Sequence, residues 1–280
     1  MLNLLEKGTK CLIVQSEFSE FGFWNYVDVC KITGAKYPAA PLGLLTVAAL
    51  LPQQWEFKLV DANVEPLLFE HFEWADIVCL GGMLPQQKSM ISIIDKAHQY
   101  GCSVVVGGPD PSSQPNLYQS ADYLVQGEGE VTIPMFIQDL EKGCKSGEYK
   151  SDDRADMTKA VVPRFDLIRF QDYIQVGIQY SRGCPFNCEF CDIIELYGRK
   201  SRTKTQEQVI KELQTLYDPV IQNDRGYHIT TFVSTTAESC WASETRGNEA
   251  ARYNFTYGQE YWLRQSHTGA GRALPVRGGN

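Results

Sequence analysis

Three closely spaced cysteines are the residues in this sequence best suited to chemistry. Cys184, Cys188 and Cys191 form a C-x3-C-x2-C pattern directly after a strand-like run. Thiolates are soft ligands that suit iron–sulfur clusters and zinc. Three thiolates on one short loop can hold a 4Fe-4S cluster and leave one iron without a protein ligand. We therefore expect a cluster whose open iron can bind a small chelating molecule.

Structural zinc is the main alternative for these thiolates. It normally has four protein ligands, and the nearest other candidates, His228 and Cys240, are remote in sequence. The remaining alternative is three buried cysteines with no ligand. The surroundings favour the cluster, because Gly183 and Pro185 shape the loop and Phe190 offers an aromatic shield beside the last ligand.

The first 140 residues alternate between strand-like and helix-like segments. The strand-like segments are residues 11–15, 57–60, 76–80, 103–106 and 123–125, and the helix-like segments are 41–51, 86–100 and 131–140. A further amphipathic helix is predicted at 205–217, with Thr205 as its N-cap. Strands that are apolar on both faces and alternate with helices predict a parallel sheet covered on both sides.

Glycine-rich turns follow three of the predicted strands. The glycines are Gly81 and Gly82, Gly107 and Gly108, and Gly127 and Gly129. Ligands of parallel sheets bind at the carboxyl ends of the strands, and glycine there lets the backbone approach a bulky ligand closely. Each pair alone could be an ordinary tight turn, but three on one edge favour a ligand crevice. No GxGxxG follows the first strand, so a dinucleotide is disfavoured.

Two stretches carry a resemblance to a known family. RGCPFNCEFCD (182–192) and GRKSRTKT (198–205) resemble the radical S-adenosylmethionine superfamily, whose signature is a C-x3-C-x-aromatic-C loop. The GGM, GGP and GEGE turns resemble the subgroup with an N-terminal cobalamin-binding domain, which includes many methyltransferases. The resemblance implies an α/β fold, in which a Rossmann-like parallel sheet of the cobalamin-binding type precedes the start of a radical S-adenosylmethionine partial (β/α) barrel.

The same resemblance implies three cofactors and their residues. A 4Fe-4S cluster would bind Cys184, Cys188 and Cys191, and S-adenosylmethionine would lie against Phe190. Cobalamin would bind at the six glycines. No DxHxxG motif is present to supply a histidine below the cobalt, so we expect bound cobalamin in the base-off form.

The implied activity is that of a radical enzyme. The reduced cluster would cleave S-adenosylmethionine to a radical that abstracts hydrogen from an unactivated carbon, and cobalamin could then supply a methyl group. The implied partners are a small-molecule substrate and an electron donor such as flavodoxin or ferredoxin. No catalytic side chain is assigned. The alternative function is a metal- or cluster-binding module without catalysis.

The pattern of the family weakens after Tyr217. We expect a cobalamin-binding domain at 1–143, a linker at 144–172, the start of the barrel at 173–225 and an atypical tail at 226–280. FVSTTAES (232–239) stands where the subgroup has an Asp-Asp-Asn segment, and codons for Ser-Thr-Thr can read as Asp-Asp in another frame. We therefore expect a truncated or frameshifted end, which would make the activity of this chain doubtful; a diverged family member is the alternative.

Net charge and composition limit the classes of partner and the cellular compartment that the sequence favours. The formal net charge of -8 argues against a broad nucleic-acid surface, and the basic residues of 198–204 are interpreted as a solvated loop or as the rim of a cofactor pocket. Nine cysteines in no regular framework favour a reducing cytoplasm over a secreted disulfide scaffold. No run reaches the ~18 apolar residues of a membrane span.

Overall fold

The structure is a computed structural model. It describes residues 8–19, 26–186, 189 and 193–216, and the backbone of 240–246, 249–254 and 259–264. Its contacts divide the chain into two units. The first comprises Met1–Ala155 with Ala160–Gly177, and the second comprises Asp156–Lys159 with Ile178–Asn280. Within the part that is described, every helix is too short or too polar to cross a membrane.

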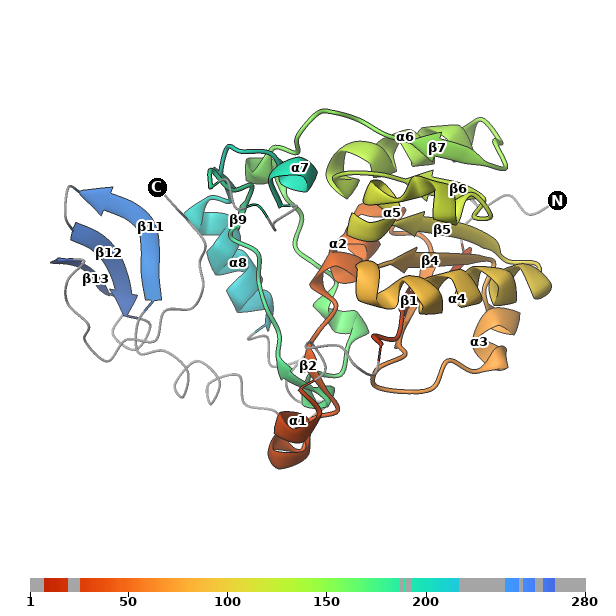
Figure 1. Ribbon diagram of the computed structural model, residues 1–280, viewed down its shortest axis with the longest axis horizontal. Helices are drawn as coiled ribbons and strands as arrows, with labels where there is room; N and C mark the ends of the chain where they lie inside the picture. The colour runs from red at the N-terminus through yellow and green to blue at the C-terminus, as the bar shows by residue number, and fades with distance from the viewer. Residues whose placement is uncertain are drawn as a thin grey trace. The chain divides into compact units, whose positions relative to one another are not determined.

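A parallel sheet forms the centre of the first unit (Figure 1). Its strands are β1 (Lys10–Gln15), β3 (Glu56–Asp61), β4 (Ile77–Gly81), β5 (Ser103–Gly107), β6 (Tyr123–Val125) and β7 (Gly147–Tyr149). They lie in the order β3-β1-β4-β5-β6-β7, which confirms the predicted parallel sheet. The edge strand β7 lies in the segment that the sequence analysis interpreted as a linker, because three residues with one exposed charge carry no readable strand pattern.

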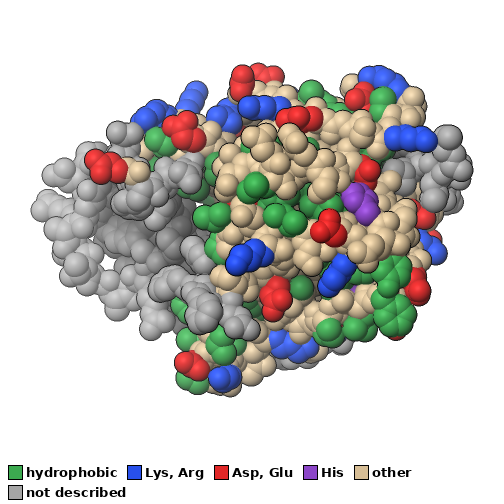
Figure 2. All heavy atoms as spheres, turned by 45° about the vertical axis from the view of Figure 1, so that its right-hand side comes forward, with side chains coloured by type: hydrophobic (Ala, Val, Ile, Leu, Met, Phe, Trp, Pro, Cys, Tyr) green, Lys and Arg blue, Asp and Glu red, His purple; other side chains and the backbone are tan. Residues whose placement is uncertain are grey.

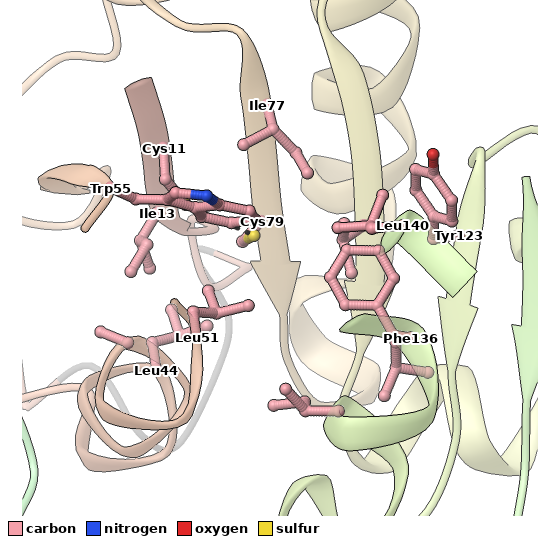
Figure 3. Packing of buried hydrophobic residues seen from close by; sticks show 14 of the residues in the cluster. Cys11, Ile13, Leu44, Leu51, Trp55, Ile77, Cys79, Tyr123, Phe136 and Leu140 are labelled. Atoms are coloured by element: carbon pink, nitrogen blue, oxygen red, sulfur yellow. Dashed lines mark hydrogen bonds between the residues drawn. The ribbon is translucent and has the colours of Figure 1, made fainter. Parts of the chain in front are cut away.

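Helices cover both faces of this sheet. One face packs against α2 (Leu42–Leu50) and α6 (Gly129–Glu141), and the other against α3 (Phe69–Trp74) and α4 (Gln87–Gln99). Alternate residues of one strand serve opposite faces: Cys11 joins the core under α2, and Leu12 joins the core under α4. Figure 3 shows the first of these cores, with Leu44 and Leu51 beneath the ring of Trp55. Apolar side chains therefore cover both faces of the sheet, as the apolar strands predict.

A glycine in the left-handed conformation closes the end of α4. Gly101 follows the helix in the left-handed conformation, with φ 75°, and its amide donates to the carbonyl of His98 at 3.0 Å. The amide of Cys102 reaches back to the carbonyl of Ala97 at 3.1 Å. These bonds close the last turn in the manner of a Schellman cap and direct the chain into β5.

Residues 160–177 pack within the first unit. They contain the single-turn helices η4 (Phe165–Leu167) and η5 (Phe170–Asp172) and the strand β8 (Tyr173–Gln175). The sequence predicts a strand at β8 that opens a second domain, but β8 pairs in parallel with β2 (Tyr37–Ala39), which follows α1 (Val27–Thr33). The Tyr173 hydroxyl donates to Oδ2 of Asp61 at 3.0 Å, so this segment is fastened to the end of β3.

The second unit has less regular structure among its described residues. It contains β9 (Ser181–Arg182), α7 (Ile193–Tyr197), β10 (Arg202–Thr203) and α8 (Gln206–Leu216). The hydroxyl of Thr205 accepts from the Gln208 amide at 3.3 Å, which confirms the predicted helix and its N-cap. In the tail that was expected to be atypical, the backbone forms an antiparallel sheet of β11 (Cys240–Arg246), β12 (Glu249–Asn254) and β13 (Gln259–Arg264). The barrel start and the four domain boundaries stay predictions.

Candidate functional site

The carboxyl edge of the parallel sheet is the first candidate site. The chain passes from β1 to β3 on one side and then returns to β4 on the other, so the strand order reverses between β1 and β4. Ligands commonly bind at such a switch point. Here hydrogen bonds bridge it: the Gln86 side chain donates to the Ser16 carbonyl at 2.7 Å, and the Ser19 amide donates to the Pro85 carbonyl at 3.1 Å.

Ser16 places a buried hydroxyl group at this bridge. The residue is fully buried, and its hydroxyl has no hydrogen-bond partner among the described residues. The side-chain amide of Asn63 donates to the Ser16 carbonyl at 3.2 Å and to Oδ1 of Asp61 at 2.8 Å. A buried hydroxyl without a partner is costly, so Ser16 carries an energetic cost at this bridge.

The predicted glycines Gly81, Gly82, Gly107 and Gly108 lie together in two adjacent turns. Gly81 and Gly107 are register partners in β4 and β5. Gly108 has φ 99°, and a Cβ there would lie 3.0 Å from the amide nitrogen of Gly82. A Cβ on Gly107 would lie 2.8 Å from the Val125 carbonyl oxygen. These glycines let neighbouring turns touch each other, and the resulting edge carries no side chains from these four positions.

Ser112 joins two of the turns. This residue lies in α5 (Pro109–Ser113), and its hydroxyl donates to the Gly108 carbonyl at 2.7 Å and accepts from the Gly127 amide at 2.8 Å. The Asp110 amide donates to the Gly82 carbonyl at 3.1 Å. The turns after β4, β5 and β6 are therefore linked in one row. Sequence reasoning missed Ser112, whose signal was its place just after the GGP turn.

Gly127 and Gly129 differ from each other in their surroundings. Gly127 has φ 83° and lies in the row of turns. A Cβ on Gly129 would lie 3.1 Å from Ile133 and 3.7 Å from Leu50, so this glycine serves the packing of α6 against α2.

Apolar side chains also reach this edge. Met83 and Leu84 follow β4 and are 38% and 63% exposed. Backbone from three turns and apolar side chains next to them make a surface that suits a wide, flat ligand. On the face of the molecule in Figure 2, basic and acidic side chains are interspersed with hydrophobic ones.

His71 and His98, which belong to the first unit, have hydrogen-bond partners away from the glycine turns. Nε2 of His98 lies 3.0 Å from Oδ2 of Asp122. Because α4 precedes β5 and Asp122 precedes β6, His98 lies at the amino edge of the sheet. Nδ1 of His71 accepts from the Leu68 amide at 3.1 Å, at the start of α3. In this arrangement both rings are engaged away from the glycine turns.

The cysteine loop is the second candidate site. Cys188, Phe190 and Cys191 lie outside the described residues, and Cys184 is partly buried. The amide of Cys184 donates to the Gly198 carbonyl at 3.0 Å. Gly183 has φ 94°, and a Cβ there would collide with the Lys200 carbonyl oxygen. Only glycine fits directly before Cys184, as the prediction that Gly183 shapes the loop requires.

Residues 198–204, here called the arm, run beside the strand that leads into this loop. Their strand β10 pairs antiparallel with β9, which places Arg202 opposite Arg182. The Arg202 guanidinium donates to the Tyr197 carbonyl at 2.9 Å, and Arg182 lies 5.8 Å from the centre of the Tyr197 ring. Lys204 is buried and forms an ion pair with Glu212. The interpretation as a solvated loop is therefore wrong for Lys204, and sequence reasoning missed Glu212.

A known protein family matches a segment of the first unit. Residues 31–137 match the B12 binding domain. An uncharacterized methyltransferase from Synechocystis sp. is 45% identical over 198 residues, which cover 70% of this chain and 37% of the relative. The hopanoid C-2 methylase of Rhodopseudomonas palustris is 40% identical over 182 residues, covering 64% and 34%.

A more distant relative has a different named substrate. The bacteriochlorophyllide d C-12(1)-methyltransferase of Chlorobaculum tepidum is 25% identical over 182 residues, which cover 62% of this chain and 40% of the relative. The chain thus spans about a third to two fifths of the length of these relatives. It carries a B12-binding domain and is a homologue of proteins named methyltransferases, a hopanoid methylase among them.

Proposed function

We propose that the chain binds cobalamin at the carboxyl edge of its parallel sheet. The row of linked turns after β4, β5 and β6 carries this proposal, because it offers a broad backbone surface without side chains at Gly82, Gly108 and Gly127. The match to the B12 binding domain supports it. Met83 and Leu84 would contact the apolar parts of the ligand.

The cobalt would have no histidine below it. The sequence lacks DxHxxG, and His98 is paired with Asp122 at the other edge of the sheet. We therefore expect a base-off spectrum. A corrin placed over the turns after β4 to β6 would leave the hydrogen bonds across the β1–β4 switch point intact.

The second part of the proposal is a 4Fe-4S cluster at Cys184, Cys188 and Cys191. S-adenosylmethionine would bind the open iron, shielded by Phe190. When bound, these cofactors would supply an electron and a transferable methyl group. The chain's own contribution would be to fix Cys184 through its amide and to exclude a side chain at Gly183.

For the whole protein we propose methyl transfer to an unactivated carbon of a small molecule, in the cytoplasm, with reduction by a flavodoxin or ferredoxin. The printed names of the relatives support a methyltransferase.

The cobalamin proposal is tested by incubating the full chain with hydroxocobalamin and desalting it. We expect bound cobalamin with a base-off spectrum. A folded chain that retains none would refute the site, and base-on coordination by His71 or His98 would refute the empty lower face. A chain that binds a cluster yet never cleaves S-adenosylmethionine under reduction would instead be a binding module.

A further inference from the structure

The Lys204–Glu212 ion pair is buried within the described part of the second unit. The lysine side chain is 5% exposed and the glutamate side chain 1%. Burying two charges is costly, and the pair is tolerated only when geometry and hydrogen bonding offset this cost. Burial raises the pKa of Glu212, and the hydrogen bond from Lys204 opposes that shift. We therefore expect this buried ion pair to have a structural role.

The two partners of the ion pair belong to different elements of the second unit. Lys204 ends the arm, and its amide donates to the Tyr180 carbonyl at 2.9 Å, which extends the β9–β10 pairing by one bond. Glu212 lies in the middle of α8. The ion pair thus fastens the arm to α8, four residues after Lys200 meets Gly183.

The arm in turn holds the first cysteine of the loop. Gly198 accepts the hydrogen bond from the Cys184 amide, and the Lys200 carbonyl packs against Gly183. A shift of the arm would move both contacts together. A ligand set for a cluster tolerates little displacement, because the thiolates must meet the irons at fixed positions.

We infer that Lys204 and Glu212 are positioning residues for the cysteine loop: their buried ion pair locks the arm to α8, and the arm sets the position of Cys184. This inference rests on the proposed cluster. It needs neither residue to touch the cluster or S-adenosylmethionine.

The test compares the two residues of the buried ion pair with exposed positions of α8 after anaerobic reconstitution. Lys204→Met and Glu212→Gln are each measured for iron and sulfide per chain, for the absorbance and electron paramagnetic resonance spectra of the cluster, and for cobalamin retained by the first unit. Lys211→Met and Glu207→Gln are the matched controls, since both residues are exposed on α8. We expect bound iron to fall about tenfold in Lys204→Met, which leaves a buried carboxylate unpaired, and to stay at the wild-type level in the controls.

A double variant separates positioning from simple loss of fold. Lys204→Met with Glu212→Leu removes both charges and keeps an apolar contact between the arm and α8, an exchange that buried pairs often tolerate. We expect it to regain at least half of the wild-type iron, with cobalamin retention unchanged throughout. Wild-type iron and spectra in both single variants would overturn the inference. So would a double variant with wild-type helix content that binds no iron, since that result would indicate direct contact with the cluster site. A wild-type chain without any cluster would instead refute the proposed function.

Discussion

The sheet edge of the first unit and the cysteine loop of the second are built by different means. At the sheet edge, glycines allow adjacent turns to contact each other. Several hydrogen bonds, made by backbone groups and by the Ser112 hydroxyl, hold the three turns in a row. At the loop, Cys184 itself is held by one hydrogen bond from its amide and by the close fit of Gly183. Its arm is held by the β9–β10 pairing and one buried ion pair. Removing one group from the hydrogen-bond network at the sheet edge should therefore weaken cobalamin binding only in part. Removing one group at the cysteine loop should remove most of the bound cluster.

The largest effect is expected at the cysteine loop. Cys184→Ala should remove most of the bound iron, because two thiolates cannot hold a 4Fe-4S cluster. Cobalamin retained by the first unit should not change. Iron and cobalamin are quantified in the same sample, with Cys144→Ala as the control because this partly buried cysteine lies in the first unit. A full 4Fe-4S spectrum in Cys184→Ala would remove the contrast between the two sites.

The next largest effect is expected where the sheet edge allows no side chain. Gly108→Ala should lower the free energy of unfolding by about 3 kcal/mol, since it combines a left-handed backbone with a collision against Gly82. Gly101→Ala is the control, because Gly101 has φ 75° with open space around its Cβ position. It should cost about 1 kcal/mol. Urea unfolding measures both, and equal losses would show that the contact between the turns is unimportant.

A smaller effect is expected from the hydroxyl that joins the turns. Ser112→Ala removes the bonds to Gly108 and Gly127 and should weaken hydroxocobalamin binding about tenfold, which corresponds to about 1.4 kcal/mol. Ser113→Ala, an exposed neighbour in the same helix, should bind as the wild type does. If both variants bind equally well, the row of turns does not depend on Ser112.

The smallest effect concerns Asp61 at the end of β3. Burial raises its pKa, while hydrogen bonds from Asn63 and Tyr173 act in the opposite direction. A raised pKa means that the folded state binds the proton more tightly, so this group favours folding more as the pH falls and loses that contribution as the pH rises through its folded pKa. The stability of the wild type relative to Asp61→Asn should therefore increase from pH 8 to pH 5. Urea unfolding at both pH values measures it, and the opposite trend would contradict the assignment.

The sequence reveals these two regions to different depths. Apolar strands such as 11–15 and the glycine after α4 indicate the sheet and its helices, because each is a local sequence pattern. β7 and the pairing of β8 with β2 depend on partners far away in the chain, and short strands carry too few residues to show them. At the sites, the glycines and Gly183 could be predicted from turn chemistry. Ser112 and Glu212 could not, since a hydroxyl and a carboxylate gain their roles only from the groups that folding brings to them.

The most direct test of the account is to quantify iron, sulfide and cobalamin together in the anaerobically reconstituted chain. We expect one cobalamin, base-off, and about four irons with matching sulfide per chain. We also expect the cobalamin to stay bound when the iron is chelated, because the proposed cobalamin site at the sheet edge does not include the cysteine loop. A folded chain that retains no cobalamin, or one that loses cobalamin in step with its iron, would contradict the account.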